Sequence, residues 1–287
     1  MNDFLTAPGI MTGLGLFFGV ILATAYKLLR VEEDPRLART EELLPGTNCG
    51  ACGEPGCLPF AQKLVSGEVQ PSGCTVASAD DIDAIADFLG VDAGEAEKRV
   101  ARLHCAGGKG QACQIAEYDG FESCRAASVV SGGGKGCSWG CLGLADCEVA
   151  CDFDAIVMND NGLPAVDIDK CTACGDCVEA CPKELFEIVP LSQKLFVQCN
   201  TPLAGESVSV LCTVGCDGCG KCAADAATGL IEMKNELPLI HYESGLPVSP
   251  KAISRCPTNA IQWLEGNQFE DQDASQNESK KRYAQLH

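Results

Sequence analysis

The chain has 287 residues, 21 of which are cysteines, and a formal net charge of −19. Only 6% of the residues are aromatic and 31 are glycine, so we expect several small modules with thin hydrophobic cores rather than one large domain. The negative charge excludes nucleic acid as a partner, because it repels phosphate. Small modules of this kind are commonly stabilised by metals or disulfides.

An uncharged, mostly apolar segment from Ala7 to Tyr26 predicts a transmembrane helix within a membrane anchor at residues 1–30. Its length matches the roughly 20 residues that span a bilayer. A signal peptide is the alternative, but the basic region that should precede one is missing, and Asp3 is the only early charged side chain. Lys27 and Arg30 follow the apolar segment, so the positive-inside rule places the rest of the chain on the cytoplasmic side of the inner (cytoplasmic) membrane.

The next module is predicted at residues 31–104 and contains four cysteines with the spacing C-x2-C-x4-C-x16-C. These are Cys49, Cys52, Cys57 and Cys74. Four thiolates without a nearby histidine favour a [4Fe–4S] cluster, with zinc as the alternative. We expect a short helix from Pro59 to Val65 that Gly67 ends, a second helix with Ser78 as its N-cap, and a third from Ala93 to Leu103.

Residues 105–136 are rich in glycine and are predicted to form a linker that contains Cys105, Cys113 and Cys124. The stretch from Ser131 to Gly136 resembles a phosphate-binding loop. It lacks the required spacing and the Ser or Thr after the lysine, so a flexible linker is favoured.

The bacterial ferredoxin pattern C-x2-C-x2-C-x3-C-P begins at Cys171 and predicts a two-cluster ferredoxin-like domain at residues 137–194. In that pattern three thiolates hold one [4Fe–4S] cluster and the fourth reaches a second cluster. Zinc ribbons use two separated pairs, and cysteines this close pair poorly as structural disulfides. Leu144 stands where a regular ferredoxin carries its middle cysteine, and Cys137 is the predicted substitute. The predicted ligands are Cys137, Cys141, Cys147 and Cys181 for one cluster, and Cys151, Cys171, Cys174 and Cys177 for the other.

Most of this cysteine framework recurs 75 residues later, at residues 195–265. The shift carries the ligands of the second cluster onto Ala226, Leu246, Ser249 and Ala252, so one complete ligand set is missing. We therefore predict a degenerate ferredoxin-like repeat that retains one cluster. Its predicted ligands are Cys216, Cys219, Cys222 and Cys256.

Four ligand sets leave five cysteines without a role: Cys105, Cys113, Cys124, Cys199 and Cys212. A fifth cluster and buried free thiols both remain open for them. Residues 266–287 are polar and charged and are predicted to be a disordered tail. The predicted fold class is α+β, built from small iron–sulfur modules behind an N-terminal transmembrane helix.

Taken together, the motifs NCGACGEPGC, CSWGCLGLADCEVACDFDAI and CTACGDCVEACP resemble the B subunit of Rnf ion-translocating electron transport complexes, in the long form with a second ferredoxin-like repeat. The resemblance implies a component of a redox-driven ion translocase that couples electron flow between ferredoxin and NAD to Na+ or H+ movement. This chain would be its electron carrier, with ferredoxin as redox partner and other membrane and peripheral subunits as neighbours. Flavin and nicotinamide chemistry would belong to those subunits.

The chain agrees with this division of roles, because it has no GxGxxG motif and no acid–base constellation, and no catalytic residue is predicted. At least three [4Fe–4S] clusters are expected, and four if the degenerate repeat retains its own. The alternative function is an iron–sulfur reductase or activator subunit of another enzyme system, such as a corrinoid protein activator, without ion coupling. A third interpretation is a zinc-binding scaffold with no redox role.

Overall fold

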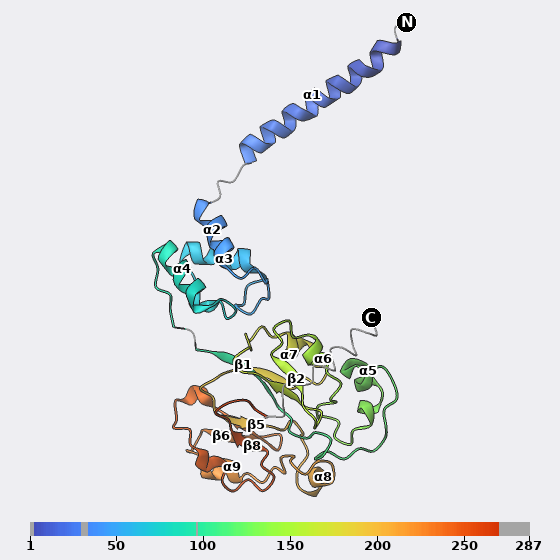
Figure 1. The fold of residues 1–287 in the computed structure, drawn as a ribbon, viewed down its shortest axis with the longest axis vertical. Coiled ribbons are helices and arrows are strands. Elements are labelled where there is room, and N and C mark those ends of the chain that lie inside the picture. Colours follow the sequence, from blue (N-terminus) through green and yellow to red (C-terminus); the bar gives the residue numbers. More distant parts are fainter. Residues whose placement is uncertain (1–2, 30–33, 96, 270–287) are drawn as a thin grey trace.

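The computed structural model describes residues 3–29, 34–95 and 97–269. Its first element is one continuous helix, α1 (Asp3–Leu29), which projects away from the other modules (Figure 1). The stretch Met11–Leu28 within α1 is long and apolar enough to cross a membrane, and none of it is buried against the protein. An apolar helix with no protein partner in the described chain agrees with the predicted anchor.

The four-cysteine module consists of short helices joined by turns. Its elements are α2 (Pro35–Leu43), α3 (Cys57–Ser66), η1 (Pro71–Gly73) and α4 (Ala79–Leu89). Gly67 ends α3 in the left-handed conformation with φ of 77°, as predicted. Ser78 caps α4 through a reciprocal capping box with Asp81, also as predicted. Both signals are local, so the sequence was sufficient to locate these helix ends.

The predicted third helix, from Ala93 to Leu103, is wrong. Arg99–Leu103 forms strand β1, which pairs antiparallel with β4 (Phe186–Pro190). Val100, Ala101 and Leu103 are almost completely buried by this pairing. Burial against a strand far away in the sequence therefore overrides the local helical pattern, and β1 belongs to the ferredoxin-like part rather than to the four-cysteine module.

Residues 99–190, called here the first module, contain two antiparallel strand pairs. They are β1 with β4, and β2 (Ile156–Met158) with β3 (Pro164–Val166); the helices are α5 (Cys124–Val129), η2 (Ser131–Gly134), α6 (Asp146–Val149) and α7 (Asp176–Ala180). The core includes Ile156, Leu163, Leu185 and several cysteines.

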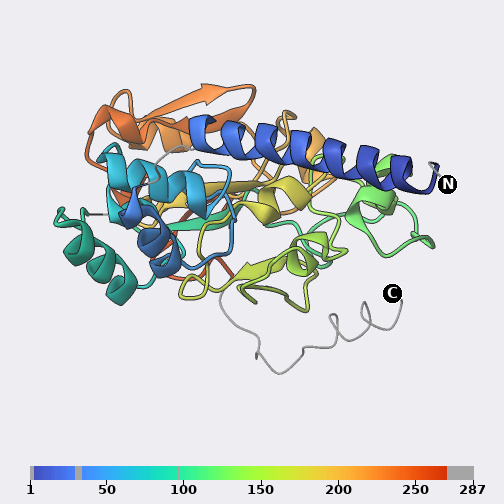
Figure 2. The ribbon, with the colours of Figure 1, turned by 90° about the horizontal axis from the view of Figure 1, so that it is seen from above.

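Residues 195–264, the second module, have the same arrangement of paired strands. They are β5 (Leu195–Val197) with β8 (Ile261–Trp263), and β6 (Ile231–Lys234) with β7 (Leu237–Ile240); the helices are α8 (Glu206–Ser209), α9 (Lys221–Asp225), η3 (Tyr242–Ser244) and η4 (Pro250–Ile253). The two modules lie side by side (Figures 1 and 2). Val189, Phe196 and Leu264 pack together where they meet. The predicted α+β class is confirmed.

The glycine-rich segment 105–136 is packed, which differs from the predicted flexible linker. Gly134 is buried with φ of 77°, and a Cβ there would lie 2.1 Å from the carbonyl oxygen of Ala116. The glycines of this stretch therefore permit close backbone approach and left-handed turns rather than flexibility.

Residues 266–269, predicted as the start of a disordered tail, also pack against the first module. The side chain of Gln268 is buried, accepts from the Leu103 amide at 2.7 Å and donates to the Leu103 carbonyl. These bonds satisfy the backbone groups of Leu103, the last residue of β1. The remainder of the predicted tail, residues 270–287, lies outside the described residues.

Candidate iron–sulfur centres

The first cysteine set lies in the loop before α3 and in the turn after η1. Cys57 is the first residue of α3, and its amide donates to the Asn48 side-chain oxygen at 2.8 Å. Cys52, Cys57 and Cys74 pack against the same small core. Burial raises the pKa of Cys74, and the neighbouring thiols of Cys52 and Cys57 raise it further. Cys49 opens the same loop three residues before Cys52, so the four cysteines come from one local unit.

The second set lines one cavity of the first module. Its members are Cys151, Cys171, Cys174 and Cys177. Burial, together with the other three thiols, raises the pKa of Cys177 to about 12. The amide of Ala155 donates to the Cys151 sulfur at 3.4 Å, and the amide of Ala101 donates to the Cys171 sulfur at 3.5 Å. The structure thus brings together the four cysteines predicted for this cluster, and amide donors of this kind stabilise cluster sulfurs.

Arg102 does not line this cavity, but it is a buried cation that follows Ala101 of the cavity wall and feels the charge of Cys171. Its side chain is only 2% exposed, and its Nη1 atom has no hydrogen-bond partner among the described residues. Burial lowers the pKa of the guanidinium, and the Cys171 thiol opposes that effect. A buried cation without a carboxylate is costly unless a negative charge lies beside it. A cluster held by four thiolates supplies that charge, so the residues fit the group.

The third set differs from the predicted one in a single member. Burial raises the pKa of Cys147 well above its usual value, and the neighbouring thiols of Cys141, Cys124 and Cys181 raise it further. Cys137, the predicted fourth member, instead lines a cavity together with Cys105, Cys199 and Cys212. Burial raises the pKa of Cys124, and the nearby backbone amides of Asp146 and Leu144 lower it. The structure therefore places Cys124, rather than Cys137, close to Cys141 and Cys147.

Asp146 explains how a cysteine from residues 105–136 reaches this site. Its carboxylate accepts from the Ser123 hydroxyl at 3.0 Å and from the Arg125 amide at 3.0 Å. These bonds tie the first turn of α5, where Cys124 lies, to the start of α6, where Cys147 lies. Sequence distance pointed to Cys137, and the repeat does not separate the two candidates, because a shift of 75 residues carries Cys124 onto Cys199 and Cys137 onto Cys212.

The fourth set lines a cavity of the second module and consists of Cys216, Cys219, Cys222 and Cys256, as predicted. Burial raises the pKa of Cys222, with further contributions from Cys256 and Cys219. The positions of the missing set are filled by apolar packing: Ala226, Leu246 and Ala252 belong to one hydrophobic cluster. Here the second module has a hydrophobic core where the first has cysteines.

Two family models match parts of these sites. One described as "Putative Fe-S cluster" matches residues 44–76, and one described as "4Fe-4S binding domain" matches residues 163–187. The first range contains the complete first set, and the second contains the ferredoxin pattern. Iron–sulfur binding, including [4Fe–4S] binding, is therefore supported independently of the geometry.

Curated relatives align along most of the chain. The B subunit of the Na(+)-translocating ferredoxin:NAD(+) oxidoreductase complex of Acetobacterium woodii is 41% identical over 91% of this chain and 78% of its own length. The B subunit of the proton-translocating ferredoxin:NAD(+) oxidoreductase complex of Clostridium ljungdahlii is 37% identical over 91% of this chain and 93% of its own length. The chain belongs to the family of B subunits of ion-translocating oxidoreductase complexes.

A third relative also aligns along most of the chain. The B subunit of the ion-translocating oxidoreductase complex of Methanosarcina acetivorans is 34% identical over 88% of this chain and 96% of its own length. The resemblance to the Rnf-type B subunit that the cysteine motifs indicated is thereby confirmed.

Proposed function

We propose that this chain is a membrane-anchored electron-transfer subunit of an ion-translocating ferredoxin:NAD oxidoreductase complex. The observation that carries the proposal is the convergence of the cysteine sets on separate spaces within neighbouring modules. Membership of the B-subunit family favours this function over the alternative of a reductase or activator subunit in another enzyme system.

Four ligand sets would each hold a [4Fe–4S] cluster. They are Cys49, Cys52, Cys57 and Cys74; Cys124, Cys141, Cys147 and Cys181; Cys151, Cys171, Cys174 and Cys177; and Cys216, Cys219, Cys222 and Cys256. A bound cluster supplies a site that gains and loses one electron without making or breaking a bond to substrate. The chain therefore needs no acid–base machinery of its own.

The protein's own contribution is to hold, shield and tune these sites. Partly or fully buried thiols keep water away, and backbone amides donate to the sulfurs of Cys151 and Cys171. Arg102 adds a buried positive charge beside Cys171. Hydrogen bonds and positive charge near a cluster stabilise its reduced form, so these residues would raise the potential of the cluster that they surround.

Helix α1 would anchor the relay beside the other membrane subunits. Lys27 lies in the last turn of α1, and the positive-inside rule then puts the modules on the cytoplasmic side of the inner (cytoplasmic) membrane. Soluble ferredoxin and NAD are found in that compartment, and ferredoxin is the proposed electron donor or acceptor.

The test is to tag the full-length chain in its own host and purify it anaerobically from detergent-solubilised membranes. We expect multi-spanning membrane subunits to co-purify and the preparation to reduce NAD with reduced ferredoxin. Cys177→Ser should lower that rate at least tenfold, whereas Cys113→Ser, at an exposed thiol outside the four sets, should not. Purification with an unrelated soluble enzyme, or an unchanged rate in the Cys177→Ser complex, would refute the proposal.

A further inference from the structure

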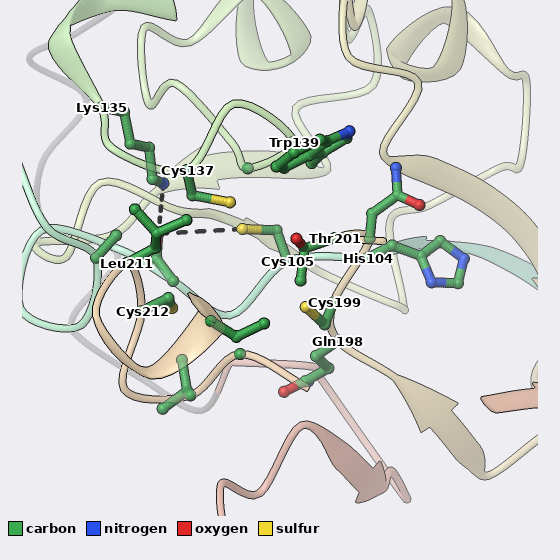
Figure 3. Close-up of a pocket in the computed structure, with 17 residues that line it drawn as sticks. His104, Cys105, Lys135, Cys137, Trp139, Gln198, Cys199, Thr201, Leu211 and Cys212 are labelled. Carbon is green, nitrogen blue, oxygen red and sulfur yellow. Dashed lines mark hydrogen bonds between the residues drawn. The ribbon is translucent and has the colours of Figure 1, made fainter. Parts of the chain in front are cut away.

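Four cysteines outside the sets above line one cavity where the two modules meet: Cys105, Cys137, Cys199 and Cys212. Cys105 and Cys137 come from the first module, and Cys199 and Cys212 from the second. In Figure 3 their side chains surround a common space with Lys135 and Trp139 at its margin. We call this cavity the seam site.

Backbone hydrogen bonds hold the two halves of the seam site together. Segment 105–113 runs beside residues 198–213: the Ala106 amide donates to the Gln198 carbonyl at 3.0 Å, and the Cys113 amide donates to the Leu211 carbonyl at 2.8 Å. Ala112 and Cys212 also form an isolated antiparallel bridge. The four cysteines are therefore positioned by ordered backbone from both modules.

Glycine keeps the space between the thiols open. A Cβ at Gly107 would lie 2.8 Å from the Cys212 sulfur and 4.0 Å from the Cys105 sulfur. The backbone amide of Val214 lies near the Cys212 sulfur, and those of Cys216 and Thr201 lie near the Cys199 sulfur. These amide–sulfur contacts are of the same kind as those in the other four sets.

Lys135 places a buried positive charge at this cavity. Its side chain is 7% exposed, and its Nζ donates only to backbone carbonyls, those of Gly107 and Cys141. No carboxylate pairs with it among the described residues. A buried ammonium in this position requires a neighbouring negative charge, which four thiolates around a metal centre would provide.

We propose that Cys105, Cys137, Cys199 and Cys212 bind a further [4Fe–4S] cluster at the seam site, with Lys135 as its buried counter-charge. A single zinc ion fits less well, because in the described part of the chain no three His, Cys, Asp or Glu side chains converge closely enough to hold one ion. The cysteines surround a space, as they do in the sets with the ferredoxin pattern.

The position gives such a cluster a defined role. The Cys141 amide donates to the Cys105 sulfur at 3.3 Å, so the seam site touches the third set in the first module. On the other side, the backbone amide of Cys216, a member of the fourth set, lies near the Cys199 sulfur. The seam cluster would connect the clusters of the first module to the cluster of the second. It would also cross-link the two modules, because each module supplies two of its ligands.

The test measures iron, sulfide and zinc per chain in the anaerobically purified full-length protein and in two variants. We expect about 20 iron atoms in the wild type, four for each of five clusters, and about 16 in Cys199→Ser/Cys212→Ser. Cys113→Ser is the matched control, because Cys113 is exposed and lies just beside the seam site, and it should keep the wild-type content. Unchanged iron in the double variant, or loss of one zinc in place of about four iron, overturns the proposal.

If the double variant does not fold, native mass spectrometry of the wild type counts the clusters bound per chain instead. A species carrying five clusters is expected, and loading that stops at four overturns the proposal. Neither readout depends on the partner subunits, so the seam site and the proposed function can fail separately.

Discussion

Two buried cations distinguish the interior of this acidic protein. Arg102 and Lys135 are 2% and 7% exposed in a chain of net charge −19, and neither has a carboxylate partner among the described residues. Each lies next to thiols that the sequence motifs or the cavity geometry identify as ligands. We infer that their role is electrostatic, because a positive charge close to a cluster favours the state with one more electron.

Arg102→Met should therefore make the reduction potential of the cluster at Cys171 more negative. Arg102→Lys, which keeps a cation, should shift it less. Potentiometric titration followed by electron paramagnetic resonance measures both. Equal shifts in the two variants would mean that Arg102 acts through packing rather than through charge.

The proposal that Cys124, rather than Cys137, is a ligand of the third set can be tested with pairs of substitutions. Because Cys124 and Cys181 would hold one cluster, Cys124→Ser/Cys181→Ser should lose only about four iron atoms, the same as either single variant. Cys137→Ser/Cys181→Ser should lose about eight, since those residues would serve different clusters. Iron analysis decides the matter, and the reverse pattern would restore the grouping predicted from sequence.

At the scale of elements, the helices that carry cluster cysteines are very short. α6 has four residues, and α7 and α9 have five each. Isolated helices of this length are unstable in water, because nucleation is not compensated by enough hydrogen bonds. Their positions must come from tertiary contacts, of which the Asp146 carboxylate on α6 is one.

Asp146→Ala should release α5 from α6 and destabilise the first module by about 1–3 kcal/mol, since two donors lose their acceptor. We expect faster cluster loss in air, followed by the decay of visible absorbance. Asp146→Asn, which retains one oxygen acceptor, should be intermediate. Asp160→Ala, at an exposed turn position, is the control and should behave as wild type. If the Asp146→Ala protein decays at the control rate, this carboxylate does not hold α5 in place.

At the scale of the whole molecule, the chain divides into an apolar helix and a set of modules that bury many of their cysteines. Met11–Leu28 is the only stretch in the described chain that is long and apolar enough to span a bilayer, and it makes no buried contact with the modules. Membrane attachment and cluster binding are therefore structurally separate.

Deleting residues 1–30 should release the protein into the soluble fraction with its iron content unchanged, because no cluster ligand precedes Cys49. Leu16→Arg/Val20→Arg in the full-length chain should have the same effect, since charges near the centre of a membrane helix oppose insertion. Fractionation without the partner subunits measures both. A truncated protein that stays in the membrane would contradict the anchor assignment.

Several features followed from the sequence alone because their signals are local. The ends of α3 and α4 were predictable from Gly67, Ser78 and Asp81, whose effects act within one helical turn. The apolar helix and the ferredoxin pattern likewise depend on residues close together in the chain. The family resemblance rested on these same motifs.

The tertiary structure alone decided which distant residues meet. Ala93 to Leu103 had a helical pattern, but β1 forms there because β4, more than 80 residues later, buries its side chains. Cys124 rather than Cys137 lies close to Cys147, where the Asp146 carboxylate joins the start of α5 to the start of α6. Local spacing identifies a thiol as a ligand, whereas the packing of modules determines which metal centre it joins, and that packing depends on contacts that no short motif contains.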